Sequence, residues 1–377
     1  MSTTDYLHHM PRDGEALAKP RREPRLHFDP ILILLLLALM AYGLVPLYSA
    51  ADRNSDVLIA QISRFGIGLV GMLVLAQFNP RLFRRWAPLV YLGGLALLAA
   101  VILIGAEVNG AQRWLDLPLL PRFQPSELVK LAGPMMVAWY LHDRTLPPSF
   151  KDVCVSLFLA LLPAALIVVQ PDLGTAILVA GAGMAVLVLA GLYWRWIGYA
   201  ALAAAAAAPG LWFLLQDYQR RRILTLFDPE SDPLGAGWNT IQAKTALGSG
   251  GFAGKGLFEG TQSRLDFLPE SRTDFIIAVI GEELGFVGIL LLLGLYLAVI
   301  GRCFVLAARA RTSFGRLLAG SLTLTFFVYV FVNIAMVSGL LPVVGVPLPL
   351  VSYGGTSAIT LLLGFGLLMS AYSHRSW

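Results

Sequence analysis

The chain has 377 residues, of which 57% are hydrophobic and only 14% are charged. Its mean hydropathy of +0.71 is more than a soluble domain of this size can hide in one core, which excludes a soluble enzyme and indicates a polytopic membrane protein. The net charge of +5 is therefore interpreted through the placement of Lys and Arg around the spans, and no nucleic-acid partner is expected.

The predicted elements begin with a polar tail. Residues 1–30 are predicted to be a disordered cytoplasmic tail, and residues 31–377 a single transmembrane domain. Apolar runs of roughly 20 residues are long enough to cross a bilayer as helices, so the expected fold is all-α with about ten spans. These runs are 31–48, 58–77, 86–106, 124–142, 153–170, 174–192, 195–214, 273–301, 317–340 and 355–373.

The basic residues of the short loops set the predicted orientation. An even number of spans puts both termini on one side of the membrane. The short loops on that side, which include Arg81, Arg84 and Arg85, carry more Lys and Arg than those on the other side. The positive-inside rule therefore predicts that both termini are cytoplasmic and that the long loop 215–272, between the seventh and eighth spans, faces outward.

The long loop contains two recognisable segments. Residues 238–247 are predicted to form a short interfacial helix. The glycine-rich segment 248–256 (GSGGFAGKG) has two interpretations: its backbone N–H groups and Lys255 cradle an anion, or its glycines adopt positive φ in a flexible hinge. No Walker, Rossmann or zinc-binding spacing occurs, so no soluble nucleotide or metal module is predicted.

Two basic residues fall in the outer half of the predicted membrane domain. Arg64 lies roughly 10 Å along the second span from its outer end, and Lys130 roughly 9 Å along the fourth. Glu127 precedes Lys130 by three residues, so the two share a helix face.

Carboxylates surround the start of the eighth span, in the stretch DFLPESRTDFIIAVIGEELG (266–285). Asp274 is predicted at the outer mouth of the span, with Glu282 and Glu283 about 12 Å further in. A carboxylate in hydrocarbon costs at least about 2.5 kcal/mol even on a lenient insertion scale. Several carboxylates near one membrane interface therefore indicate a functional role.

These charges have two interpretations. They form ion pairs that lock the bundle, such as Glu127 or Glu283 with Lys130, or they line a polar cavity open to the outer leaflet. The set as a whole favours a cavity, because charges within a membrane usually line one. Cations there suit an anionic headgroup such as a pyrophosphate, and a carboxylate at the rim suits a general base.

Other polar residues are weaker candidates. Asp172 is explained most simply as a helix N-cap. Arg113 and Trp114 either hold a headgroup or anchor their loop at the interface. Ser352, Tyr353 and Thr356 belong to the Pro- and Gly-rich stretch 340–357, and they either line the cavity or make turns.

Several long motifs in this sequence resemble one family. In chain order they are NGAQRWLD, FQPSELVK, VQPDLGTA, GWNTIQAKTALGSGGFAGKG, FLPESRTDFIIAVIGEELG and LPVVGVPLPLVSYGGTS. Their order is similar to that of the SEDS family of bacterial cell-wall glycosyltransferases, over nearly the whole chain from residue 30 onward. The C-terminal motif looks more like the elongation branch (RodA) than the division branch (FtsW). Arg272 stands where the family more often has His.

The resemblance implies an activity and partners. The activity is polymerisation of lipid II into glycan strands at the outer face of the bacterial cytoplasmic (inner) membrane, for cell-wall elongation and rod shape. The partners are lipid II and the growing glycan chain, a class B penicillin-binding protein that supplies the transpeptidase, and the elongation machinery.

The resemblance also implies residue roles. Asp274 matches the family's essential carboxylate, and Arg64 and Lys130 match its basic residues. Asp266 matches a loop acid that modulates activity in the division branch. Glu127, Arg113 and Trp114 match in motif and are expected to bind substrate, as are Ser352 and Tyr353. Lys255 is expected to act from the modulating loop, and Glu282, Glu283 and Asp172 to form supporting ion pairs.

Chemistry and resemblance together predict a mechanism. Asp274 deprotonates the 4-hydroxyl of the acceptor sugar, which attacks C1 of the lipid-linked donor, while Arg64 and Lys130 stabilise the leaving pyrophosphate. No cofactor is firmly predicted, and a divalent cation, Mg²⁺ or Mn²⁺, is an option. Two alternatives are a lipid II flippase and a non-catalytic scaffold for the penicillin-binding protein. Clustering of the charges toward the outer half favours chemistry over transport.

Overall fold

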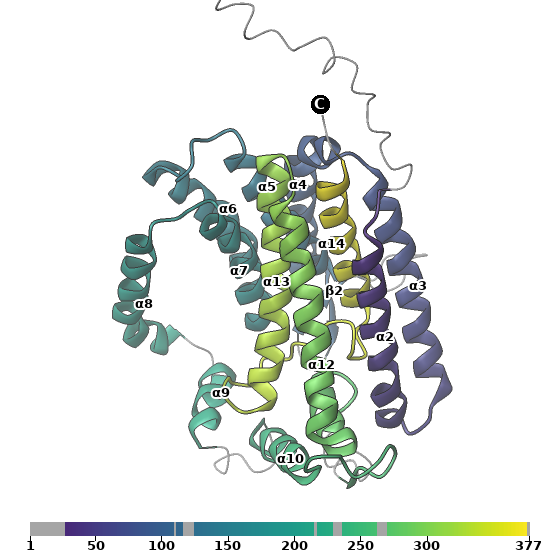
Figure 1. Ribbon diagram of the computed structural model, residues 1–377. Coiled ribbons are helices and arrows are strands. Elements are labelled where there is room, and N and C mark those ends of the chain that lie inside the picture. Colours follow the sequence, from purple (N-terminus) through teal and green to yellow (C-terminus); the bar gives the residue numbers. More distant parts are fainter. Residues whose placement is uncertain are drawn as a thin grey trace, which may run out of the picture.

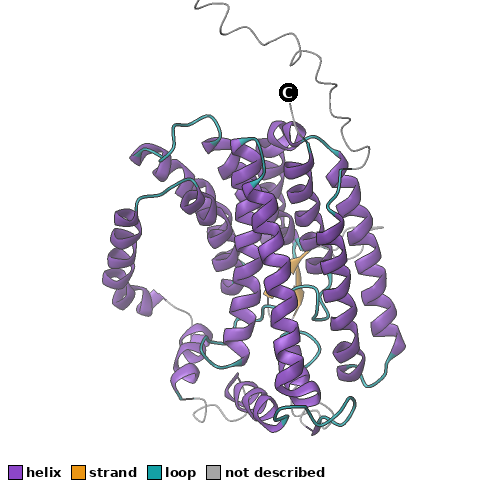
Figure 2. Cartoon of the chain, viewed as in Figure 1, coloured by secondary structure: helices purple, strands orange, loops and turns teal. Residues whose placement is uncertain are grey.

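The computed structural model describes residues 27–108, 111–115, 124–214, 217–228, 236–261 and 270–374. Most of the described chain is helical (Figure 2). Ten helices coincide with the ten predicted apolar runs: α2 (Pro30–Ala50), α3 (Ser55–Gln77), α4 (Pro80–Ile104), α5 (Pro125–Leu141), α6 (Phe150–Val169), α7 (Leu173–Leu189), α8 (Trp194–Leu214), α12 (Ile276–Ala308), α13 (Ser313–Val337) and α14 (Thr356–Ser373).

Seven of these helices in the described chain are long and apolar enough to cross a membrane, namely α2, α3, α4, α6, α12, α13 and α14. The predicted all-α polytopic membrane fold is confirmed, whereas the count of ten spans stays a prediction. The disordered tail predicted for 1–30 lies outside the described residues apart from its last four.

Two elements of the long loop are helical as well. α9 (Asp217–Phe227) follows α8, and α10 (Ala236–Ser249) covers the segment predicted as a short interfacial helix. Figure 1 shows α10 lying across the end of the bundle farthest from the C-terminus. A two-stranded antiparallel hairpin, β1 (Ala106–Val108) with β2 (Ala111–Trp114), was not predicted from the sequence.

Local sequence explains where the helices begin. The Asp29 side chain accepts a hydrogen bond from the N–H of Leu32 at the start of α2, and Asn79 caps α4 ahead of a proline in its first turn. Ser149 and Asp152 form a reciprocal capping box at the start of α6. Each cap satisfies N–H groups that the first helical turn leaves without a partner.

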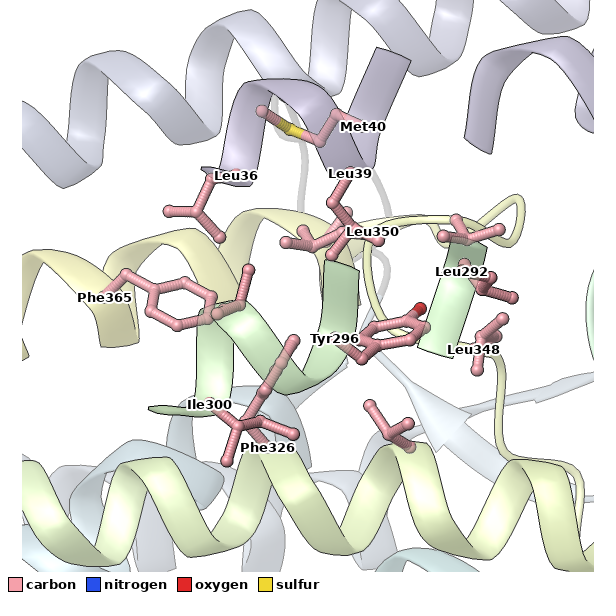
Figure 3. Packing of buried hydrophobic residues seen from close by; sticks show 14 of the residues in the cluster. Leu36, Leu39, Met40, Leu292, Tyr296, Ile300, Phe326, Leu348, Leu350 and Phe365 are labelled. Carbon is pink, nitrogen blue, oxygen red and sulfur yellow. The ribbon is translucent and has the colours of Figure 1, made fainter. Parts of the chain in front are cut away.

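The core gathers around α12, which packs against α2 and α13. Tyr296 of α12 is 1% exposed and lies among Leu39 and Met40 of α2, Phe326 of α13 and Leu350 (Figure 3). Its hydroxyl donates to the carbonyl of Pro349 at 2.6 Å. The irregular stretch before α14 is therefore held inside the helical bundle, as its Pro- and Gly-rich sequence predicted.

α12 is broken at Gly285, whose φ of 66° and ψ of −160° are not helical. The glycine-rich loop packs its backbone into this break: the N–H groups of Lys255 and Gly256 donate to the carbonyls of Glu282 and Glu283, both at 3.0 Å. A Cβ on Gly254 would collide with the Glu283 carbonyl, so the close approach requires glycine.

This packing decides between the two interpretations of segment 248–256. Gly251, Gly254 and Gly256 have positive φ, and the Lys255 ammonium binds Glu282 at 2.7 Å. The glycines thus serve the backbone conformation. The Lys255 ammonium pairs with a buried acid of the same chain, which favours the glycine-conformation interpretation over the anion cradle.

Contacts with distant segments place the two glutamates near α10. Glu283 accepts from Ser49 in the last turn of α2 at 2.6 Å, and Glu282 is bound by the loop that follows α10. Both acids therefore lie at the end of the bundle beside α10 (Figure 1). The helical stretch between Asp274 and the two acids is intact, because Gly285 lies beyond both of them, so their position follows from the contacts with Ser49 and Lys255.

Candidate functional site

One cavity of about 390 Å³ gathers most of the predicted site residues, a volume typical of small-molecule sites. Its walls come from the hairpin, the starts of α5, α7 and α14, the end of α13, the turn before α12 and the irregular stretch before α14. The lining residues are Arg113, Trp114, Gln124, Glu127, Lys130, Asp172, Thr175, Leu178, Glu270, Thr273, Asp274, Tyr329, Gly345, Val346, Pro347, Tyr353, Gly354, Gly355, Thr356 and Ser357.

Asp274 lies in the turn 270–275, directly before α12. Its backbone carbonyl accepts a hydrogen bond from the side chain of Asn333 at 2.8 Å. A Cβ on Gly345 would come within 3.5 Å of Asp274 Oδ2, so glycine leaves space at the carboxylate. Among the described residues none donates a hydrogen bond to this carboxylate, which leaves it available to a ligand in the cavity.

The environment of Asp274 favours its protonated form. Burial raises the pKa of the Asp274 carboxyl to about 6, and the negative charge of Glu270 adds to the increase, while the positive charge of Arg222 opposes it. A carboxylate with a pKa near 6 is still ionised at neutral pH, yet it takes up a proton more readily than an ordinary aspartate. This combination suits a general base.

Lys130 and Glu127 form an ion pair in the cavity wall. Lys130 Nζ lies 2.6 Å from Glu127 Oε1, and its ammonium lies 5.1 Å from the centre of the Tyr329 ring. The two interpretations drawn from the sequence are thus both realised, because the ion pair is itself part of the cavity. Lys130 keeps donor capacity toward the cavity, since an ammonium has three hydrogens.

Arg113 and Asp172 join the hairpin to the start of α7. Asp172 caps α7 by accepting from the N–H of Thr175 at 3.2 Å, as predicted, and also lies 3.7 Å from Arg113 Nε. Arg113 Nη2 donates to the carbonyl of Pro171 at 2.6 Å. Trp114, the next residue, lines the cavity, so this contact fixes one of its walls.

Arg64 lies behind the cavity wall. Its Nη2 donates to the Tyr353 hydroxyl at 3.1 Å and its guanidinium lies 4.5 Å from the centre of that ring. Tyr353 lines the cavity and Arg64 does not. The predicted basic residue therefore contacts the cavity wall through Tyr353.

Ser352 requires a correction. It is 2% exposed, its hydroxyl accepts from the N–H of Leu348 at 2.9 Å, and it does not line the cavity. It makes a turn, which was the alternative interpretation, whereas Tyr353 and Thr356 do line the cavity. Neighbouring residues point differently here because the backbone is not helical, so no periodicity predicted which of them would face inward.

The remaining predicted residues lie elsewhere. Glu282 pairs with Lys255, as predicted for a supporting ion pair, and Glu283 binds the Ser49 hydroxyl. None of these residues lines the cavity. Asp266 lies outside the described residues.

Sequence reasoning missed several residues that line the cavity or support its wall. Tyr329 looks like an ordinary core aromatic in an apolar helix, and Thr175 like a helix-start residue. Asn333, which binds the turn that holds Asp274, is a fully buried amide on α13. An isolated amide in a predicted span is a signal that could have identified it, because such groups need partners in a membrane.

Comparison with known proteins gives consistent matches. Residues 29–376 match the model of the FtsW/RodA/SpoVE family, described as cell cycle proteins. The peptidoglycan glycosyltransferase MrdB of Escherichia coli K12 is 54% identical over 352 residues, which cover 93% of this chain and 95% of MrdB.

Solved structures agree with this assignment. A chain of a peptidoglycan synthase complex, solved to describe how polymerization and crosslinking are coordinated, superimposes with a TM-score of 0.81 at 34% identity, covering 92% of this chain and 97% of that one. The rod shape determining protein RodA of Thermus thermophilus gives a TM-score of 0.69 at 31% identity, covering 92% and 96%. The chain therefore belongs to the FtsW/RodA/SpoVE family.

Proposed function

We propose that this protein is a peptidoglycan glycosyltransferase that polymerises lipid II at the outer face of the bacterial inner membrane, for cell elongation and rod shape. The observation that carries the proposal is the unengaged carboxylate of Asp274, in the same cavity as the basic side chains of Lys130 and Arg113. The activity named for the 54% identical relative supports the reaction class.

The proposed chemistry needs one base and a site for the leaving anion. Asp274 removes the proton from the 4-hydroxyl of the acceptor sugar as this oxygen attacks C1 of the donor sugar. The bond from C1 to the pyrophosphate breaks, and undecaprenyl pyrophosphate leaves with the bond electrons. Lys130 and Arg113 stabilise its charge, while Arg64 holds Tyr353 against the substrate.

The donor set of the cavity does not enclose a metal ion by itself. Among the described residues, no three side chains of His, Cys, Asp or Glu gather closely enough to hold one. A Mg²⁺ or Mn²⁺ ion usually binds through one or two carboxylates together with substrate phosphates, and the cavity offers Asp274 and Glu270 for that arrangement.

We further propose a partner and an orientation. The similar chain with the TM-score of 0.81 comes from a complex that couples polymerization to crosslinking. A class B penicillin-binding protein that crosslinks the new strand fits that role here, together with the elongation machinery. The asymmetry of Lys and Arg in the short loops supports cytoplasmic termini, and with them a cavity that faces outward.

The test separates polymerisation from transport. The full chain, purified with its penicillin-binding partner, receives labelled lipid II in the presence of a penicillin, so that strands form without crosslinks. We expect long glycan strands on a denaturing gel. In proteoliposomes we expect no faster movement of fluorescent lipid II between leaflets. Translocation without strand formation would overturn the proposal in favour of a flippase. The absence of both activities would overturn it in favour of a non-catalytic scaffold.

The raised pKa of Asp274 predicts a pH dependence. Because the base must be ionised, the polymerisation rate should fall as the pH drops through about 6. Changing Glu270→Gln removes a negative charge that raises this pKa, so the acidic limb of the profile should move to lower pH. The rate of strand formation between pH 4.5 and 8 measures both effects.

A matched control is Glu259→Gln, which removes an exposed acid that does not line the cavity. Its profile should coincide with that of the unchanged protein. An acidic limb that stays in place in Glu270→Gln, or moves to higher pH, would contradict the electrostatic assignment. High salt should shrink the shift, because Glu270 is exposed and its field is screened.

A further inference from the structure

Asn333 is a fully buried amide near the end of α13 that holds two separate stretches of chain. Its Nδ2 donates one hydrogen bond to the backbone carbonyl of Asp274 at 2.8 Å and another to that of Val346 at 2.7 Å. Both hydrogens of the amide nitrogen are therefore in use. Asn333 does not itself line the cavity.

The two carbonyls belong to segments without regular secondary structure. Asp274 lies in the turn before α12. The N–H of Ala278, in the first turn of α12, donates to the carbonyl of Phe275, the residue after Asp274. Val346 lies in the irregular stretch between α13 and α14 and is 3% exposed. The Val346 carbonyl is buried and the Asp274 carbonyl is partly buried, and one amide supplies a donor to both.

These segments form facing walls of the cavity. One wall carries Glu270, Thr273 and Asp274, and the other carries Gly345 and Val346. Asp274 Oδ2 lies 3.5 Å from the position that a Cβ of Gly345 would occupy. Asn333 is hydrogen-bonded to both of these segments, so it fixes the distance between the Asp274 carboxylate and the opposite wall.

The side-chain oxygen of Asn333 makes no such contact in the described part of the chain, in contrast to its side-chain nitrogen. Asn333 Oδ1 is buried without a hydrogen-bond partner among the described residues. An unpaired buried oxygen is unfavourable, and a leucine of similar size would avoid it. The contribution of Asn333 is therefore the two hydrogen bonds that its Nδ2 donates.

We propose that Asn333 is a positioning residue for the reaction, which fixes the carboxylate of Asp274 against the Gly345–Val346 wall where the acceptor sugar binds. It acts through the backbone and touches no substrate. The inference rests on the proposed function, because a position matters to catalysis only if Asp274 is the base.

The test compares two variants of the full chain in complex with its partner. Asn333→Leu removes both hydrogen bonds, and we expect kcat for strand formation to fall about 100-fold with KM within about threefold, because a base displaced by about 1 Å still permits binding. Asn333→Ser retains one donor and should lie between Asn333→Leu and the unchanged protein.

The matched control is Thr323→Val. Thr323 is also buried on α13, but its hydroxyl bonds only to the Ala319 carbonyl of its own helix. We expect unchanged kcat. Hydrogen exchange monitors the contact directly: peptides covering 270–278 and 343–352 should exchange faster in Asn333→Leu and at the normal rate in Thr323→Val.

Each outcome decides the inference. Normal kcat in Asn333→Leu, together with an inactive Asp274→Asn, would overturn the positioning role and leave the proposed function intact. An active Asp274→Asn would overturn the proposed function, and the positioning role with it. Loss of monodispersity and partner binding in parallel with activity, in both Asn333 variants, would show a merely structural residue.

Discussion

Asp274→Asn is expected to lower the rate of strand formation by about 100- to 10,000-fold, the usual contribution of a general base. The amide has nearly the shape of the carboxylate and cannot accept the proton at neutral pH. Because none of the described residues donates a hydrogen bond to this side chain, the change should leave the fold intact. Strand formation from labelled lipid II measures the rate, and a thermal melt of the purified complex measures stability.

Asp56→Asn serves as the control for this change. Asp56 is an exposed acid in the first turn of α3, does not line the cavity, and should be neutral in the assay. A rate for Asp274→Asn within threefold of the unchanged protein would contradict the assignment of Asp274 as the general base. Normal melting with lost activity would exclude a purely structural explanation.

Replacement of Lys130 by Met is expected to produce the second large effect. Loss of a cation that faces a leaving pyrophosphate typically costs about 100- to 1,000-fold in rate. The change also leaves Glu127 buried without its partner, and breaking a buried ion pair costs about 3–5 kcal/mol of stability. The single variant therefore confounds chemistry with folding.

The double variant Lys130→Met, Glu127→Gln separates the two effects. It removes both charges, and replacing a buried ion pair as a unit is often neutral for stability. We expect a melting temperature close to that of the unchanged protein, with the rate still reduced about 100-fold or more. If the double variant regains the rate as well as the stability, the Lys130–Glu127 ion pair only stabilises the helical bundle.

Sequence reasoning predicted the helices because their signal is local, and it placed Asp274 among the residues that line the cavity. Apolar runs of about 20 residues mark helices whatever they pack against. Lys130 and Glu127 are three residues apart on one helix face, so Glu127 was one of the two ion-pair partners proposed for Lys130, and it is the one that the structure shows. The motif around Asp274 identified the acid through resemblance.

The errors share a different cause, which is contact between distant segments. Asn333 meets Asp274 and Val346 through two irregular stretches whose path no periodicity fixes. Glu282 and Glu283 meet Lys255 and Ser49, partners far away in the sequence that helix spacing does not predict. Arg64 was expected in the cavity, but the ring of Tyr353, almost 300 residues along, covers it.

The order in which the cavity walls are synthesised has a consequence for biogenesis. The hairpin and the starts of α5 and α7 leave the ribosome early, whereas the turn with Asp274 and the stretch 345–357 come from the last third of the chain. A nascent chain inserted as far as α13 already carries its acid but lacks the wall opposite. The cavity is lined on all sides only after residues 345–357 and the start of α14 have entered the bundle, so the proposed activity depends on a late-synthesised part of the described chain.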